Sequence, residues 1–216
     1  MPFSSVLGAS SVIKPGVCTS TTRPTVPFEG QLIYETDTDM VAAYNGSAWV
    51  YTHSSGLVRF AGADFSAAAS LTVDNCFTSS YTNYRLMFNF TGAATASPVI
   101  QLRVGGVTAA TNYQRQRLDA TGTQMSPART TAQPSLEFGV IETDFRNSAI
   151  LEILQPAQAQ FTNFYMSSLY TSGASTTDVV WLDTYGLHSA ATAYDGFIVS
   201  FGTNATGTYT LYGYGK

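Results

Sequence analysis

The octapeptide "NYRLMFNF", Asn83–Phe90, carries large apolar side chains at every second position: Tyr84, Leu86, Phe88 and Phe90. Successive side chains of a β-strand point to opposite faces, so this period of two predicts a strand with one buried face. "YTLYGY", Tyr209–Tyr214, shows the same alternation near the end of the chain. No stretch has a convincing period of 3.6 residues, and the sequence therefore predicts an all-β protein.

Strand candidates recur along the second part of the chain, separated by Gly, Ser, Thr and Asp residues that are typical of turns. They are Ser70–Val73, Tyr84–Phe90, Val99–Val104, Leu136–Ile141, Ala149–Leu154, Phe161–Leu169, Val179–Leu182, Gly196–Phe201 and Thr208–Tyr214. Gly105-Gly106, between two of them, is predicted to form a hairpin turn. Strands at this spacing favour an antiparallel, jelly-roll-like β-sandwich over residues 57–216.

Residues 30–56, which begin "GQLIYETDTDMVAAYNGSAWVYTH", predict a small β-hairpin or meander unit of three strands. Asn45-Gly46 between two apolar runs predicts a type I′ turn, which needs positive φ at both central residues. A unit of this size is marginally stable in water unless something packs on its face. We expect identical subunits to supply that cover, with docking or trimer contacts from the four aromatic residues Tyr34, Tyr44, Trp49 and Tyr51.

Residues 1–29 contain four prolines, Pro2, Pro15, Pro24 and Pro27, among many Ser and Thr residues. Each proline removes a backbone donor and biases the preceding residue away from the helical region. We therefore predict an extended anchoring arm that orders against a partner, with Pro24 and Pro27 among its docking contacts. "HSSG", His53–Gly56, is predicted to link the small unit to the sandwich.

The composition is poor in charge. Charged residues make up 11% of the 216 residues, against about 25% in ordinary soluble domains. We interpret this as a surface committed to neutral contacts, between subunits or with a sugar-like target; a soluble monomer with a neutral surface is the alternative. The net charge of −4 and the pI near 5.0 argue against nucleic acid as a partner, since that would need a basic stripe.

Three further features bear on location. No run of about 20 apolar residues is present, so no membrane span is expected. Met1–Lys14 lacks a charged region ahead of a long apolar one and is a poor signal peptide. Cys18 and Cys76 do not make a disulfide framework, which is consistent with folding in a reducing cytoplasm.

"RPTVPFEGQLIYETDTDMVAAYNGSAWV", Arg23–Val50, resembles a segment of tailed-bacteriophage virion proteins, in which a Pro-rich arm leads into such hairpins. "CFTSSYTNYRLMFNF" (Cys76–Phe90), "LRVGGV…NYQRQ" (Leu102–Gln116) and the terminal "YDGFIVSFGTNATGTYTLYGYGK" (Tyr194–Lys216) are also similar to such proteins. The resemblance implies a tail-fibre, collar-fibre or head-decoration subunit. Such proteins are commonly homotrimers with an N-terminal anchor and a C-terminal sandwich that often recognises a bacterial surface polysaccharide or protein. The long shaft of an extended fibre is missing.

Catalytic patterns are weak. Asp183, His188 and Ser189 contain the residue types of a hydrolase triad, but they lie in one short run without a Gly-x-Ser-x-Gly elbow. We therefore interpret His188 as a turn histidine and expect no enzyme activity.

The chain also contains paired carboxylates and potential metal ligands. Glu35, Asp37 and Asp39 cluster in the small unit, and Glu142 and Asp144 alternate at a strand end, in patterns that could serve a glycosidase. Asp37-Thr38-Asp39 also has oxygen donors that could bind calcium. Acidic residues at tight turns are the ordinary alternative, and the calcium-loop Gly and final Glu are missing. No phosphate-binding glycine loop and no zinc ligand set is present. We expect no metal and no cofactor.

Arg103, Arg115, Arg117 and Arg129 form the one basic concentration. They are expected to face acidic sugars, the carboxylates of a neighbouring subunit or solvent. Exposed aromatic residues near loops could stack on sugar rings, although most aromatics of a sandwich belong to its core. The candidate receptor contacts are Arg115, Arg117, Trp181 and Tyr185.

The leading hypothesis is a non-enzymatic structural protein of the virion, made in the host bacterial cytoplasm. A homotrimer would dock to other phage virion proteins of the tail, neck or capsid through the arm and the hairpin unit, and the sandwich would face outward for host attachment. Trimerisation would place three weak binding sites in one assembly, and avidity would raise its overall affinity for the host surface. The alternatives are a capsid decoration or cement protein with a mechanical role, and a lectin-like module that binds host surface polysaccharide.

Overall fold

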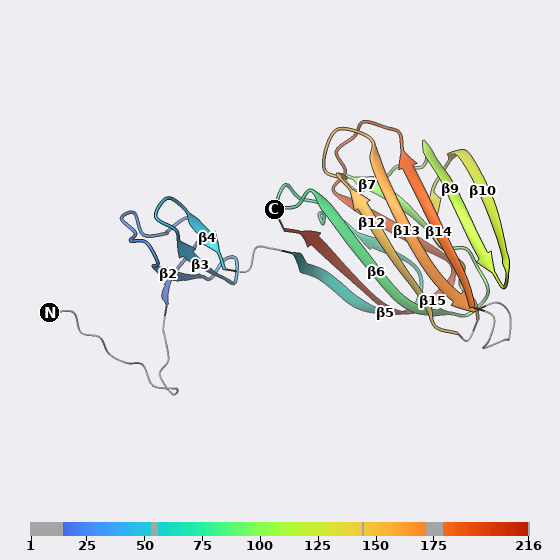
Figure 1. Ribbon diagram of the computed structural model, residues 1–216, viewed down its shortest axis with the longest axis horizontal. Helices are drawn as coiled ribbons and strands as arrows, with labels where there is room; N and C mark the ends of the chain where they lie inside the picture. The colour runs from blue at the N-terminus through green and yellow to red at the C-terminus, as the bar shows by residue number, and fades with distance from the viewer. Residues whose placement is uncertain (1–14, 53–55, 144, 172–178, 216) are drawn as a thin grey trace. The chain divides into compact units, whose positions relative to one another are not determined.

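The computed structural model describes residues 15–52, 56–143, 145–171 and 179–215. The chain divides into two compact units, residues 1–54 and residues 55–216, called here the small unit and the large unit. Every regular element among the described residues is a β-strand, and none is a helix (Figure 1). The all-β prediction is therefore confirmed.

The small unit is a four-stranded sheet in the order of the chain. Its strands are β1 (Gly16–Cys18), β2 (Leu32–Glu35), β3 (Met40–Tyr44) and β4 (Trp49–Tyr51). β2, β3 and β4 are antiparallel, as expected of a meander, whereas β1 pairs with β2 in parallel.

The presence of β1 corrects the expectation of an arm that orders only against a partner. Gly16–Cys18 pairs with Ile33–Glu35, and the carbonyl of Cys18 accepts a hydrogen bond of 2.9 Å from the amide of Thr36. The residues between Pro15 and Pro24 all keep their backbone donors, so the prolines do not prevent pairing there. Pro2 and the rest of Met1–Lys14 lie outside the described residues, as do His53–Ser55 of the expected linker.

The turn between β3 and β4 also differs from the prediction. Gly46 has a φ of 90°, but Asn45 does not have positive φ, so the type I′ turn is wrong. The amide of Asn45 instead donates to the carbonyl of Ala48, and the Asn45 side chain accepts the amides of Ser47 and Ala48. The chain therefore reverses over Gly46-Ser47, with the asparagine side chain capping the loop.

The large unit contains the remaining strands. They are β5 (Leu57–Val73), β6 (Asn83–Gly92), β7 (Val99–Val104), β8 (Val107–Thr108), β9 (Tyr113–Thr121), β10 (Gln124–Gln133), β11 (Leu136–Glu137), β12 (Asn147–Leu154), β13 (Thr162–Thr171), β14 (Val179–His188) and β15 (Gly196–Tyr214). They make one antiparallel sheet, in the order β10-β9-β14-β13-β12-β6-β15-β7-β11, with β5 on β15 and β8 on β7.

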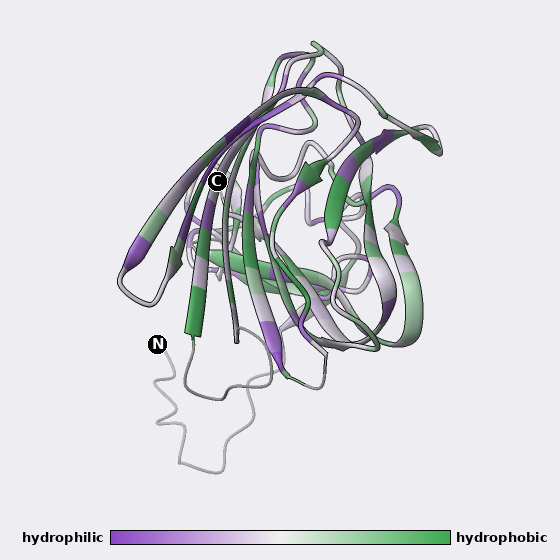
Figure 2. Cartoon of the chain, turned by 90° about the vertical axis from the view of Figure 1, so that its right-hand side faces the viewer, coloured by the Kyte–Doolittle hydropathy of each residue, from purple (hydrophilic) through white to green (hydrophobic). Residues whose placement is uncertain are grey.

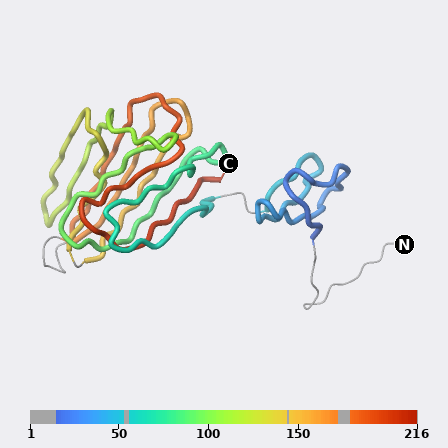
Figure 3. The backbone as a smooth tube through the Cα atoms, turned by 180° about the vertical axis from the view of Figure 1, so that it is seen from behind, coloured from blue at the N-terminus to red at the C-terminus, as the bar shows by residue number. Residues whose placement is uncertain are grey.

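β15 divides this sheet into two parts. Its first half, Gly196–Ser200, pairs with β7, and its second half, Ala205–Gly213, pairs with β6. β5 follows both halves on the other side, and Figures 1 and 3 show β5 and β15 side by side. The change of partner falls at Gly202, whose φ of 74° is a conformation that glycine adopts without steric cost. Two expected strands, Gly196–Phe201 and Thr208–Tyr214, are therefore one long strand.

The two parts of the sheet enclose one core. Phe88 of β6 stacks on Phe138, which follows β11, with 5.9 Å between ring centroids. Leu136 of β11 lies against Gly186 of β14, so close that an added Cβ would stand 2.8 Å from its Cδ1. Tyr84, Leu86, Phe88 and Phe90 are all buried, which confirms the alternation in β6. Figure 2 shows hydrophobic and hydrophilic residues alternating along such strands. The jelly-roll-like assignment stays a prediction.

Two neighbouring strands were not expected from the sequence. β9 and β10 form a hairpin around Thr121–Gln124, and β9 pairs with β14 on its other side. Their sequences, "YQRQRLDAT" and "QMSPARTTAQ", have few apolar residues, so they lack the pattern of a half-buried strand. β10 is an edge strand, which explains why it tolerates Pro127. Gly105-Gly106 joins β7 to β8 as predicted, with φ of 56° and 78°.

Candidate functional site

One face of the small unit is apolar and is not covered by other described residues of that unit. Alternation along the paired strands places six side chains on it: Val17, Leu32, Tyr34, Val41, Ala43 and Val50. Val17, Leu32 and Val50 are exposed, Val17 by 61%, and the other three are half-buried. We call this six-residue surface the open face. None of its side chains is charged, and soluble proteins rarely leave a contiguous apolar surface without a binding role.

The opposite face of the small unit is covered by the segment that joins β1 to β2. Ile33, Glu35 and Ala42 are fully buried there. The Arg23 guanidinium forms an ion pair with Glu35 and donates a hydrogen bond of 3.1 Å to the Tyr51 hydroxyl. Glu35 also accepts hydrogen bonds from Tyr51, at 3.0 Å, and from Thr38, at 3.1 Å. The Glu35 carboxylate is therefore buried but fully partnered.

Hydrogen bonds lower the pKa of two carboxyl groups in the small unit, Glu35 and Asp37. The hydrogen bond from Arg23 is the main cause that lowers the pKa of Glu35, and those from Tyr51 and Thr38 add to it. The Ser20 side chain and amide donate to Asp37 at 2.6 and 2.8 Å and lower the pKa of that carboxyl. Asp39 accepts the Tyr34 hydroxyl at 2.6 Å. Each of the three carboxylates therefore has a separate partner, and they do not converge on one ligand.

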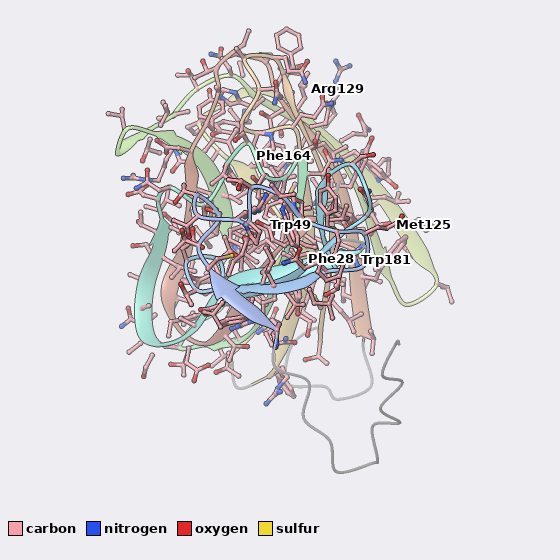
Figure 4. All side chains as sticks on the ribbon, turned by 90° about the vertical axis from the view of Figure 1, so that its left-hand side faces the viewer. Phe28, Trp49, Met125, Arg129, Phe164 and Trp181 are labelled. Atoms are coloured by element: carbon pink, nitrogen blue, oxygen red, sulfur yellow. The ribbon has the colours of Figure 1, made fainter. Side chains whose placement is uncertain are left out.

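The expected docking residues fall into two groups. Tyr34 lies on the open face, whereas Tyr44, Trp49 and Tyr51 share the covered face, where the Tyr44 and Trp49 rings lie 5.4 Å apart. Pro24 and Pro27 are half-buried in the covering segment, next to the exposed Phe28. Figure 4 labels Phe28 and Trp49. The aliphatic residues of the open face were missed, although the period of two in "LIYE" and "MVAAY" indicates which residues share a face.

The outer face of the large unit carries an exposed tyrosine pair. Tyr165 of β13 and Tyr185 of β14 are cross-strand partners, with ring centroids 5.5 Å apart and an interplanar angle of 66°. They are 48% and 56% exposed. Trp181 lies on the same face of β14, half-buried, and its indole N–H donates to Ser167 at 3.2 Å. Of the expected receptor contacts, Tyr185 and Trp181 are therefore on an accessible sheet face.

Arg115 and Arg117, the other expected receptor contacts, point to the opposite face of β9. Their side chains are 14% and 19% exposed. Both pair with Glu137 of β11, Arg115 at 2.9 Å, and Arg117 also pairs with Asp119 at 2.7 Å. Carboxylates of the same chain thus occupy these arginine side chains, which face away from the side chain of Tyr185. Arg115 and Arg117 lie two and four residues after buried Tyr113 on β9, so alternation directs their side chains inward.

The residue types of a hydrolase triad do not assemble. Asp183 and His188 of β14 are five residues apart and therefore face opposite sides of the sheet. His188 is buried against Tyr113 and Tyr194, whose hydroxyl lies 3.2 Å from Nδ1, and burial lowers its pKa. Ser189 bonds the carbonyl of Asn112. His188 is thus a core histidine at the end of a strand, and not the turn histidine that was expected.

The remaining candidates are separate from one another. Glu142 accepts a hydrogen bond from Thr95 at 3.0 Å, and Asp144 lies outside the described residues. Cys18 and Cys76 are free thiols, and burial raises the pKa of Cys76 to about 12. In the part of the chain that the structure describes, no three His, Cys, Asp or Glu residues gather where they could hold a metal ion. No helix of these residues is long and apolar enough to cross a bilayer.

Comparison of the chain with protein-family models, with curated proteins and with solved structures found no match. The geometry leaves two candidate binding surfaces: the open face of the small unit and the outer face of the large unit around Tyr165 and Tyr185. Both are suited to binding, one to an apolar protein surface and the other to a ligand that stacks on aromatic rings.

Proposed function

We propose that this chain is a non-enzymatic structural subunit of a bacteriophage particle. Its small unit docks it as a homotrimer, and its large unit is presented outward. The observation that carries the proposal is the open face, because a sheet of four short strands needs cover on its apolar face and the small unit supplies none there. The resemblance of Arg23–Val50 to phage virion segments supports the type of particle and the trimer.

The occupant of the open face is a further copy of the same chain. Its six side chains are uncharged, so that copies meet without burying like charges. Val41, the second residue of the inner strand β3, is flanked on this face by Tyr34 of β2. Burying such side chains against the same side chains of another copy stabilises the assembly by about 25 cal/mol per Å² of apolar surface. Of the aromatic residues expected in this contact only Tyr34 lies on the open face, and its five other side chains are aliphatic.

The oligomeric state of the full chain tests this proposal. Val41→Asp puts a carboxylate on the open face, on the inner strand β3, and we expect a trimer to become a monomer in sedimentation analysis. Val26→Asp is the matched control, because Val26 is 90% exposed outside the strands, and it should remain trimeric. A wild-type chain that is monomeric at high concentration, or a Val41→Asp chain that stays trimeric and folded, would contradict the proposal.

A second role, attachment to a host surface saccharide, is favoured by the exposed pair of Tyr165 and Tyr185. Exposed aromatic rings beside polar side chains are suited to stacking on sugar rings. Trimeric presentation would raise the avidity of such a site for a repeating polymer. Retention of the full chain on host polysaccharide, with competition against infection, would support this role. A trimer without such retention would indicate a decoration or cement protein with a mechanical role.

A further inference from the structure

A hollow of about 360 Å³ lies on the outer face of the large unit, across four neighbouring strands. Its lining comes from β10, β9, β14 and β13, which are adjacent in the sheet. Strands are about 4.8 Å apart, so the hollow extends about 14 Å across the sheet. That span exceeds one sugar ring and is suited to an elongated ligand.

The two exposed tyrosines form one wall of this hollow. Tyr165 and Tyr185 line it together with the aliphatic side chain of Leu187. Because the rings meet at 66°, they present two differently oriented surfaces to a ligand. The C–H faces of a saccharide pack on aromatic rings of this kind, while its hydroxyl groups remain available for hydrogen bonds.

Unused polar groups form the floor and the far wall. Gln114, Gln116 and Asn163 line the hollow, and none of their side chains hydrogen-bonds another described residue. Arg129 of β10 is exposed at the far side, in register with Gln116, which in turn pairs with Tyr185. Arg129 is exposed whereas Phe164 of β13 is fully buried, and both are labelled in Figure 4.

Arg129 differs from most arginines of the chain in its charge environment. Arg23, Arg85, Arg103, Arg115 and Arg117 all form ion pairs with carboxylates of the chain. Within the described residues Arg129 has no such partner, and no acidic side chain lines the hollow. A guanidinium in this state is available for a bidentate pair with a carboxylate from elsewhere.

We propose that this hollow binds an acidic saccharide, with a sugar ring on Tyr165 and Tyr185 and the carboxylate of a uronic-acid type residue on Arg129. Gln114, Gln116 and Asn163 bond the hydroxyl groups between them. The proposal deepens the attachment role above by naming the ligand class, and it does not depend on trimerisation.

The surroundings of the tyrosine pair set the direction of the ligand. A second hollow lies on the other side of the same rings and contains Asp183 and Glu152. Glu152 is held by Arg85, at 2.5 Å, and by the Tyr214 hydroxyl, whereas Asp183 has no partner among the described side chains. The negative charge on that side repels a carboxylate. The acidic group of the saccharide therefore points toward β10 and not toward β12.

The test is binding of the full chain to three carboxylated polymers: polygalacturonate, alginate and hyaluronate. The carboxyl-reduced form of each polymer is the neutral reference. We expect at least one acidic polymer to bind, with its reduced form at least tenfold weaker, and the difference to shrink at high salt because ion pairs are screened. Arg129→Gln should reduce binding of the acidic polymer to the level of the reduced one.

Matched variants separate the site from general effects. Tyr185→Ala should weaken both forms of the polymer at least tenfold, since it removes the stacking surface. Arg146→Gln removes an exposed arginine and Phe161→Ala an exposed ring, both outside the lining of this hollow, and both should bind like wild type. Failure of all three acidic polymers to bind, equal binding of the reduced form, or unchanged binding by Arg129→Gln would overturn the proposal. None of these outcomes alters the oligomer test of Val41→Asp.

Discussion

The carboxylate of Glu35 is fully buried in the small unit and is paired with the guanidinium of Arg23, whose side chain is 29% exposed. The pair joins β2 to the segment between β1 and β2, and Tyr51 of β4 completes it through hydrogen bonds with both residues. One ion pair thus ties together three parts of a unit that has few apolar residues to bury. Its two partners are unequal, because the arginine can reach water and the glutamate cannot.

This inequality predicts the order of two substitutions. Arg23→Ala leaves a buried carboxylate without its cation, and we expect a loss toward the lower end of the about 3–5 kcal/mol typical of broken buried pairs. Glu35→Gln leaves an arginine that can turn to solvent, so it should cost less. Unfolding followed by Trp49 fluorescence, in a Trp181→Phe background, reports on the small unit alone, since these are the two tryptophans of the chain.

Glu29→Gln serves as the matched control for Glu35→Gln. Glu29 is exposed and makes no ion pair with another described residue. It should change the free energy of unfolding by less than about 0.5 kcal/mol, as expected of a surface substitution. If Arg23→Ala is as mild as this control, the ion pair does not support the unit.

The stability of the small unit should depend on acid pH. The pKa of Glu35 and that of Asp37 are lowered in the folded unit, so folding favours their ionised forms. The stabilisation is complete above the unfolded values, about 4, and is lost as pH falls through the folded pKa values. The denaturant midpoint of the Trp49 signal should fall from pH 5 to pH 2. Glu35→Gln should flatten that slope in part, with the remainder due to Asp37; an unchanged slope would rule out Glu35.

The large unit has a separate pH dependence from His188. Burial lowers its pKa, so the unfolded chain binds a proton more readily than the folded one. Stability should therefore decrease as pH falls below the unfolded value of about 6.5. In a Trp49→Phe background, His188→Phe removes the titrating group and should make the Trp181 unfolding midpoint less sensitive between pH 7.5 and 5.5. An equal slope in both proteins would assign the dependence to another group.

A single glycine limits the pairing of β6 and β15. An added Cβ at Gly207 would stand 2.1 Å from the carbonyl oxygen of Asn89 and 2.6 Å from the Cα of Phe90. These are backbone atoms that cannot turn aside, so Gly207→Ala should cost about 3 kcal/mol or more, at or above the top of the usual range for overpacking. Thermal unfolding by circular dichroism measures this loss.

Gly16→Ala is the control for that substitution. Its added Cβ would meet Ile33 at an ordinary 3.7 Å, and its φ is not positive. It should leave the melting curve of the large unit unchanged. A Gly207→Ala chain that melts with the control would mean that β15 shifts to make room.

Local patterns in the sequence were sufficient for much of the fold. The bounds of β7 agree with the predicted Val99–Val104, and the alternation in "NYRLMFNF" identified the buried face of β6. Gly105-Gly106 forms the expected hairpin turn. These features depend on side-chain alternation and on the conformations open to glycine, which are properties of neighbouring residues.

The candidate site depended on contacts between distant residues. Arg117 was expected at a receptor surface, but Glu137, twenty positions later, faces it from β11 and holds it inward. Tyr165, also twenty positions from its partner Tyr185, gained significance only through the pairing of β13 with β14. Of the basic concentration Arg103, Arg115, Arg117 and Arg129, the exposed member is Arg129, because the register of β10 places it on the outer face.

The sequence by itself determined that the chain forms strands, where most of them lie, and which side chains of β6 are buried. The tertiary structure decided which arginines are paired, which tyrosines meet, and that two predicted strands are one continuous β15. The physical reason is range: alternation and turn chemistry act between neighbours, whereas pairing of charges and rings depends on strand register, which the whole sheet fixes.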